Sequence, residues 1–159
     1  MDATAAAPLL IGKILCKKAD DKIIKARITE TECYFGEEDT ACHASKGKTN
    51  RTKILYEQGG KAYVYLCYGI HYLLNIVTGA KNIPQAVLIR GIEGCNGPGK
   101  LTKHLNIDKS LNGENLITSD KLWVEDDGSV YDFTTLTRVG INYATEEYRN
   151  KPWRFLAKK

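Results

Sequence analysis

Short β-branched and aromatic segments, separated by glycine-containing turns, constrain the fold of this chain more than any other feature. These strand-like runs are residues 23–34, 61–66, 72–77, 86–90, 122–125 and 137–141. The last two are expected to form a hairpin through an Asp127-Gly128 turn, and a glycine-rich turn at 94–99 leads into one predicted helix over 100–105. Because strands and helices do not alternate as in a parallel sheet, we predict an α+β fold with a mainly antiparallel sheet.

The composition permits a single domain with its own apolar core. Of the 159 residues, 43% are hydrophobic and 26% are charged, which is close to the average for globular domains. No apolar run approaches the roughly 18 residues that a membrane-spanning helix needs, and the N-terminus lacks the features of a signal peptide. We expect one domain over residues 1–159, a poorly ordered stretch at 1–8, and no membrane association.

The cysteines indicate a reducing compartment. They are five in number and include no CxxC pair, which favours free thiols over a disulfide framework. We therefore expect the protein to be located in the cytoplasm and nucleoid if the source is bacterial, or in the nucleus if it is eukaryotic. The spacing of cysteine and histidine matches no known zinc motif, so we expect no metal and no cofactor.

Basic residues gather in a few places, although the net charge is only +4. Lys46, Lys48, Arg51 and Lys53 lie within eight residues, and further lysines and arginines crowd the C-terminus. Such a distribution can form a basic face for a polyanion. Solvated surface charge remains the simpler explanation at this point.

Two glutamates and a tyrosine share one face of the first predicted strand. Side chains alternate along a strand, so Glu30, Glu32 and Tyr34 point to the same side. Two neighbouring carboxylates beside an aromatic ring can raise the pKa of one of them and make it a general base. Taken alone, the pattern fits two solvated glutamates better.

Tyrosine is concentrated in one part of the chain. Five of the nine tyrosines lie within the 17 residues from Tyr56 to Tyr72. Buried phenols each need a hydrogen-bond partner, so an ordinary core uses them sparingly. Aromatic side chains of this kind can stack on nucleic-acid bases, and a protruding Tyr68 could wedge between them. An aromatic-rich hairpin without such a function explains the pattern equally well.

The segment Gly94 to Lys100 is close to a phosphate-binding P-loop. That motif needs Ser or Thr after the lysine to hold Mg²⁺, whereas this chain has Leu101. The strand–loop–helix context of a P-loop is also missing, so nucleotide hydrolysis is not favoured. Backbone amides at the start of the following helix could still bind a DNA phosphate.

In their order and content, several segments together resemble the alkyladenine (3-methyladenine, N-methylpurine) DNA glycosylases. The segments are residues 10–15, 27–43, 48–52, 63–75, 86–90, 97–101 and 151–155. The resemblance covers nearly the whole chain, with ends that are short relative to the family. It implies a single domain with a curved antiparallel sheet and a few surrounding helices. It also implies a monofunctional hydrolase, similar to type II 3-methyladenine DNA glycosylases, that needs no cofactor.

The resemblance also implies roles for individual residues at the reaction centre. Glu32 resembles the general base that activates water for attack on C1′ of a flipped nucleotide, and Arg90 resembles the arginine that helps to hold this water and the phosphate. The implied walls of the base pocket are Tyr34, His43, Tyr65 and Asn75, where Asn75 excludes a purine 2-amino group.

Further residues resemble the family's DNA contacts. Tyr68 corresponds to the wedge that enters the minor groove, flanked by Ile70 and His71, while Lys48, Arg51 and Lys100 fall in stretches that contact phosphates. The implied partner is double-stranded DNA with damaged purines (3-methyladenine, 7-methylguanine or hypoxanthine), bound by a monomer. A non-catalytic nucleic-acid-binding module remains the alternative, because it would use the same aromatic and basic side chains without needing Glu32 and Arg90 together.

Overall fold

The longest strand, β2 (Lys22–Tyr34), organises the fold because different strands pair with it along its length. In the computed structural model, which describes residues 1–158, the first half of β2 pairs with β1 (Ile14–Ala19). Its second half pairs with β5 (Ala86–Ile92) and with β9 (Arg154–Ala157). The pairing with β5 shifts in register between Ile28 and Thr31, and the resulting bulge increases the local twist.

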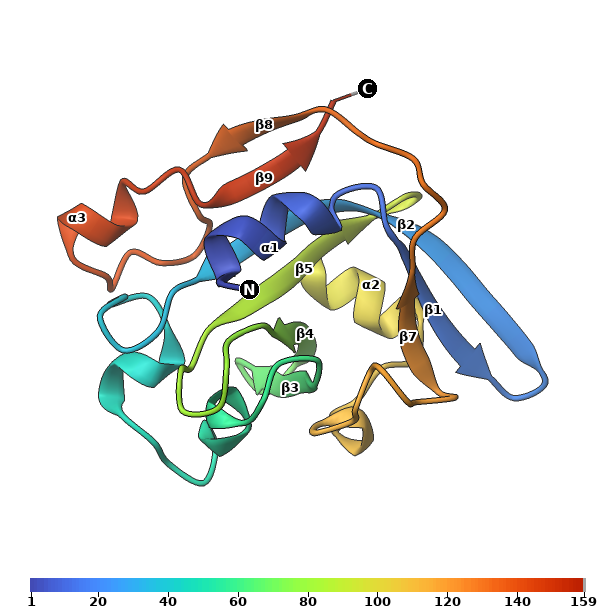
Figure 1. Cartoon of the computed structure of the whole chain (residues 1–159), viewed down its shortest axis with the longest axis horizontal. Coiled ribbons are helices and arrows are strands. Elements are labelled where there is room, and N and C mark those ends of the chain that lie inside the picture. Colours follow the sequence, from blue (N-terminus) through green and yellow to red (C-terminus); the bar gives the residue numbers. More distant parts are fainter. Residues whose placement is uncertain (159) are drawn as a thin grey trace.

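All the strands of the described residues belong to one nine-stranded antiparallel sheet, which curls around the apolar core (Figure 1). The main path runs β3-β4-β5-β2-β1-β7, and β6 and β8 pair with β5 and β9 respectively. The other elements are α1 (Ala3–Leu10), β3 (Ala62–Cys67), β4 (His71–Val77), β6 (Cys95–Asn96), α2 (Pro98–His104), β7 (Leu122–Glu125), β8 (Phe133–Leu136) and α3 (Glu146–Arg149), with 3₁₀ turns at His43–Lys46, Lys53–Tyr56 and Lys109–Leu111. The predicted α+β fold with a curved antiparallel sheet is confirmed.

Alternation along the strands separates the core from the site. On β5, Val87 and Ile89 face the apolar clusters to which α1 and α2 contribute. Their neighbours Leu88 and Arg90 therefore point to the opposite face. Leu88 pairs with both Glu32 of β2 and Asn75 of β4, so the polar and aromatic residues of three strands meet on that second face.

Most of the predicted elements are present, with small shifts of their ends. The strands expected at 23–34, 61–66, 72–77, 86–90 and 122–125 correspond to β2, β3, β4, β5 and β7, and the helix expected at 100–105 is α2. Residues 40–60, which contain no strand, include two 3₁₀ turns. Strands β1 and β9 were not predicted. No helix in the described part of the chain combines the length and apolarity of a membrane span.

The prediction of a strand over 137–141 is wrong, and so is the predicted hairpin through Asp127-Gly128. Residues 137–141 contain no strand; the strand of this region is β8, which pairs with β9, whereas β7 pairs with β1. The backbone N–H of Val139 donates to Glu32 instead of to a neighbouring strand, and Gly140 has a φ of +74°. Both features take this segment out of the sheet.

Residues 3–8, part of the stretch for which we expect poor order, form the first turns of α1. The side chain of Asp2 caps this helix by accepting a hydrogen bond from the N–H of Ala5. Ala3 and Ala7 are fully buried against the sheet, and the N–H of Ala3 donates to the side chain of Gln85. The small alanine side chains let the helix pack closely against the sheet.

Candidate active site

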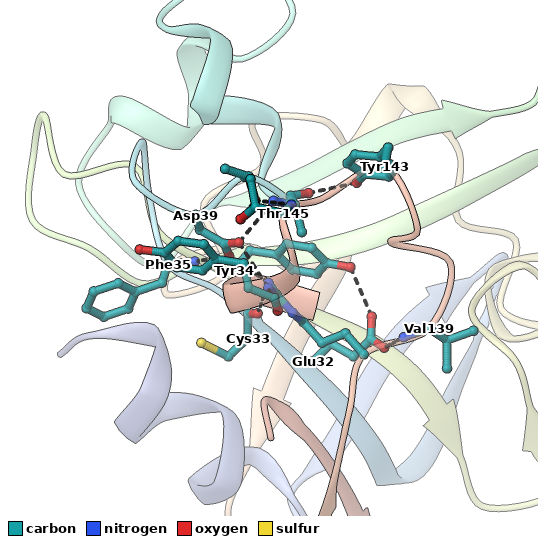
Figure 2. A network of polar contacts seen from close by, with 12 residues as sticks. Glu32, Cys33, Tyr34, Phe35, Asp39, Val139, Tyr143 and Thr145 are labelled. Atoms are coloured by element: carbon teal, nitrogen blue, oxygen red, sulfur yellow. Dashed lines mark hydrogen bonds and ion pairs between the residues drawn. The ribbon is translucent and has the colours of Figure 1, made fainter. Parts of the chain in front are cut away.

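Glu32 lies near the C-terminal end of β2 with a fully buried side chain, and each of its carboxylate oxygens accepts one hydrogen bond. One of its oxygens, Oε1, accepts from the hydroxyl of Tyr34 at 3.0 Å, and the other accepts from the N–H of Val139 at 2.7 Å. Nη1 of Arg90 on β5 lies 3.8 Å from Oε1. Figure 2 shows the Tyr34 ring reaching over Glu32 and Val139 approaching from the other side.

The surroundings of Glu32 prepare it to exchange a proton. Burial raises the pKa of Glu32 above its usual range, and this effect outweighs the opposing influence of Arg90, the Val139 N–H and the Tyr34 hydroxyl. A carboxylate with a raised pKa is a stronger base than an ordinary one, which suits general-base catalysis. The predicted pair of Glu32 and Arg90 is therefore brought together, with Tyr34 as an additional partner.

Arg90 is held in place by the second glutamate of the same face. Oε2 of Glu30 lies 3.7 Å from Nε of Arg90 and accepts a hydrogen bond from Arg154 at 2.9 Å. Nε of Arg90 is buried and has no hydrogen-bond partner among the described residues. A buried donor left unpaired is uncommon in proteins, and it is available to an acceptor on a bound molecule.

The predicted pocket residues Tyr34, His43, Tyr65 and Asn75 all line one cavity beside Glu32. Its other lining residues are Ala41, Cys42, Leu55, Tyr63, Ala86 and Tyr143. The rings of His43 and Tyr65 pack at 4.5 Å between centroids, and those of Tyr63 and Tyr65 at 5.4 Å. Because residues 63, 65 and 75 lie on the same face of paired strands, the sheet itself brings these side chains together.

The two polar side chains His43 and Asn75 of the cavity are each held by a contact with Tyr63. Burial, together with the positive charges of Arg51 and Lys46, lowers the pKa of His43 to about 4, so its ring is neutral near pH 7. Nδ1 of His43 lies 3.0 Å from the hydroxyl of Tyr63. The amide of Asn75 donates to the carbonyl of Tyr63 at 3.2 Å and is only 4% exposed. These contacts fix the side chains of His43 and Asn75, and the aromatic cavity that they line suits a flat aromatic ligand.

The predicted wedge residues lie at the tip of the β3–β4 hairpin. Tyr68 and Ile70 are 87% and 72% exposed, and His71 begins β4. Tyr68 has a φ of +53°, which is rare for a residue with a bulky side chain and frequently marks a functional position. A Cβ added at Gly99 would lie 2.8 Å from His71, so glycine allows α2, with exposed Lys100, to approach the hairpin closely.

The other two predicted phosphate contacts lie on the loop above the cavity. Lys48 and Arg51 are both exposed, and each covers an aromatic ring: Lys48 lies 5.7 Å from the centroid of Tyr56, and Arg51 lies 5.4 Å from that of Tyr65. Arg51 is therefore next to the cavity rather than remote from it. A cation over the ring is a favourable contact of about 0.5–1 kcal/mol at exposed sites.

The sequence did not indicate that residues 137–145 contribute to the site. Arg138 is buried in an ion pair with Asp39, with nitrogen–oxygen distances of 2.6 and 2.9 Å, and its guanidinium lies 5.0 Å from the ring centroid of Tyr34. The next residue, Val139, donates to Glu32, and Tyr143 lines the cavity. The only feature of the sequence that could have indicated this contribution is a single arginine, Arg138, within the predicted strand.

Within the described residues, no group of three or more His, Cys, Asp or Glu side chains is arranged to hold a metal ion. The groups that the site does present are a buried carboxylate, an arginine with an unpaired donor and an aromatic cavity. These three features adjoin each other on one face of the sheet.

Comparisons with known proteins agree on one family. The model of the family described as "Methylpurine-DNA glycosylase (MPG)" matches residues 1–159. A protein of Borrelia garinii subsp. bavariensis named "Putative 3-methyladenine DNA glycosylase" is 48% identical, over 99% of this chain and 91% of its own. Proteins with the same name from Natranaerobius thermophilus and Rickettsia felis are 40% and 41% identical, over 97% and 98% of this chain and 89% and 87% of theirs.

Proposed function

Because the chain belongs to the methylpurine-DNA glycosylase family, and is thus a hydrolase of DNA repair that acts on N-glycosidic bonds, we propose a specific mechanism for it. The protein turns an alkylated or deaminated purine out of duplex DNA and removes it with a water molecule activated by Glu32. The observation that carries this proposal is the position of buried Glu32, with its raised pKa, directly beside the aromatic cavity.

The damaged base enters the cavity before the chemical step. Turning a base out of the helix costs a few kcal/mol, and each aromatic contact with the base contributes about 1–3 kcal/mol. Exposed Tyr68 at the hairpin tip can fill the gap that the base leaves in the duplex. Purines such as 3-methyladenine and 7-methylguanine carry a positive charge and are attracted to the faces of Tyr34, Tyr65 and neutral His43.

Hydrolysis then needs a base for the attacking water. Nη1 of Arg90 and Oε1 of Glu32 are 3.8 Å apart, which exceeds a direct hydrogen bond, and a water bound beside this pair can accept from Arg90 and donate to Glu32. The oxygen of this water bonds to C1′ while the bond from C1′ to the purine nitrogen breaks, and its electron pair leaves with the base. Glu32 takes the proton from the water, and an abasic site remains.

This mechanism involves no covalent intermediate with a lysine, so we propose a monofunctional enzyme. We further propose that the protein acts as a monomer on double-stranded DNA and without a metal. Its place of action would be the bacterial cytoplasm and nucleoid, or the nucleus if the source is eukaryotic. Hypoxanthine is neutral and needs protonation before it leaves, so it is the more demanding substrate of the proposed set.

The test is single-turnover release of 3-methyladenine, 7-methylguanine and hypoxanthine from duplex DNA in EDTA, which isolates chemistry from product release. In Glu32→Gln the amide oxygen can still accept from the Val139 N–H and the amide nitrogen can donate to the Tyr34 hydroxyl. The side chain cannot accept the proton of the attacking water. We expect at least a 10²-fold slower reaction with unchanged affinity for DNA that carries an abasic-site analogue.

Glu30→Gln is the matched control, because it lies on the same strand face and can still accept the hydrogen bond of Arg154. It should lose much less activity than Glu32→Gln. Equal losses in the two variants, or a near-parent rate in Glu32→Gln, contradict the assignment of Glu32. A parent protein that binds the lesion duplex but releases no base favours the alternative, a non-catalytic binding module.

A further inference from the structure

The cavity beside Glu32 is too small for a base in the conformation that the structure describes. Its volume is about 30 Å³, which is room for about two water molecules. A purine has nine ring atoms and cannot enter this space. At least one wall of the cavity has to move before the site can take a flat ligand of that size.

Most of the walls cannot move without opening the core. Leu55, Tyr63 and Cys42 are at most 4% exposed and belong to one packed apolar cluster. Asn75 is equally buried and is tied to the backbone of Tyr63. Displacing any of these side chains would expose apolar surface or break a buried hydrogen bond, and closely packed interiors resist such changes.

Tyr143 is different, because it lines the cavity and is largely exposed to solvent. Its side chain lies beside the cavity while the residue as a whole is 68% exposed. Its hydroxyl donates a hydrogen bond of 2.8 Å to the carbonyl of Ala41, another lining residue. This contact spans 102 positions of the sequence and joins the segment 137–145 to the loop that follows β2 (Figure 2).

The backbone on either side of Tyr143 is fixed. The N–H of Val139 donates to Glu32, and the N–H of Thr145 donates to the hydroxyl of Thr40 at 2.9 Å. Ile141 is 4% exposed and packs with Ala41 and Ala144. The segment is therefore anchored before and after Tyr143, and opening needs only a rotation of the Tyr143 side chain into solvent.

We propose that Tyr143 is the gate of the base pocket, a residue that must release the Ala41 carbonyl and turn outward before a purine can enter. This inference rests on the proposed function, which supplies the flipped base. The hydrogen bond between Tyr143 and Ala41 stabilises the closed pocket, so it opposes insertion of every base. A base with weak insertion energy is then retained in the duplex, whereas one held strongly by the aromatic walls displaces the tyrosine.

Tyr143→Phe tests the gate, because it keeps the ring and removes only the hydroxyl. Dissociation constants are measured by fluorescence anisotropy, at one fixed salt concentration, for two duplexes. One carries hypoxanthine on a 2′-fluorinated sugar, which resists hydrolysis, and the other carries a tetrahydrofuran abasic-site analogue, which has no base to insert. We expect roughly two- to tenfold tighter binding of the hypoxanthine duplex, as one net hydrogen bond provides, and unchanged binding of the abasic duplex.

Two further variants complete the experiment. Tyr131→Phe removes a hydroxyl that does not line the cavity and should change neither constant. Tyr143→Ala removes the ring as well and should tighten binding of the hypoxanthine duplex at least as much as Tyr143→Phe. Equal effects of Tyr143→Phe on both duplexes, or weaker binding of the hypoxanthine duplex by Tyr143→Ala, overturn the gate and identify Tyr143 as a fixed wall.

The gate and the proposed function fail in different ways. If the parent protein releases damaged bases but Tyr143→Phe leaves both dissociation constants unchanged, the gate is refuted and the proposed function stands. If the parent protein binds the hypoxanthine duplex no better than undamaged DNA and releases no damaged base, the proposed function fails and the gate fails with it.

Discussion

Replacing Asp39 by asparagine should destabilise the protein strongly, because this carboxylate serves four donors at once. It accepts two hydrogen bonds from Arg138, one from the N–H of Phe35 at 3.0 Å and one from the N–H of Ala41 at 3.0 Å. Neither Asp39 nor Arg138 exposes any side-chain surface. The substitution converts one acceptor oxygen into a donor and leaves the buried guanidinium without its counter-charge.

The size of the effect follows from the burial of the pair. Removing one partner of a buried ion pair costs about 3–5 kcal/mol, because the remaining charge is left uncompensated in the interior. Domains of this size have a free energy of unfolding of about 5–15 kcal/mol. Asp39→Asn should therefore remove a large fraction of the total stability, and with a urea slope of ~2 kcal/mol/M the midpoint should fall by roughly 1.5–2.5 M.

The assay is urea unfolding followed by circular dichroism, with Asp127→Asn as the matched control. Asp127 pairs with Arg27 at 2.9 Å on the surface, where ion pairs contribute little, so its midpoint should barely change. Arg138 also lies against Tyr34 and precedes Val139, which donates to Glu32. Asp39→Asn should therefore slow base release even below its unfolding midpoint. A midpoint shift no larger than that of Asp127→Asn would refute this reasoning.

Three further predictions concern the site itself. Asn75→Ser leaves space where the amide stands and should raise excision of guanine relative to hypoxanthine; an unchanged ratio of the two single-turnover rates counts against Asn75 as the discriminating residue. Tyr68→Ser removes the exposed hairpin side chain and should weaken affinity for abasic-site DNA without changing the thermal midpoint, so equal affinity at one salt concentration contradicts its role as a wedge. The raised pKa of Glu32 means that the folded state holds this proton more tightly than the unfolded chain does. As pH rises from the usual glutamate range through the raised pKa, Glu32 loses its proton, so the parent should gain activity. Over the same range the parent should lose stability relative to Glu32→Gln. Urea midpoints of the two proteins that change in parallel between about pH 4 and pH 8 would contradict this direction of the stability change.

Local sequence patterns were sufficient to place the strands that form the floor of the site. Alternation along β2 puts Glu32 and Tyr34 on one face, and the structure joins them by a hydrogen bond of 3.0 Å. The same alternation along β3 puts Tyr63 and Tyr65 together. Periodicity predicts such neighbours because a strand fixes the direction of each side chain within two residues.

Glu32 and Arg90 were paired by the resemblance to a family rather than by periodicity. They lie on different strands, and strand alternation alone does not specify which residues of two strands meet. The register between β2 and β5, including its bulge, brings Nη1 of Arg90 to 3.8 Å from Glu32. The sequence pattern of the short β1 and β9 was also too weak to predict them, and they are placed by their pairing with β2.

The tertiary structure alone decided what covers the site. Residues 137–141, within the segment 137–145, are predicted to form a β-strand, because Val139 and Ile141 alternate with polar residues and glycine. The segment is instead held by contacts with residues about 100 positions earlier: Arg138 with Asp39, Val139 with Glu32, and Tyr143 with Ala41. A buried charge needs its partner wherever the chain can supply one, and this requirement overrides local strand propensity. No pattern within the segment encodes a partner so distant, so the cover and the gate of the pocket exist only in the folded chain.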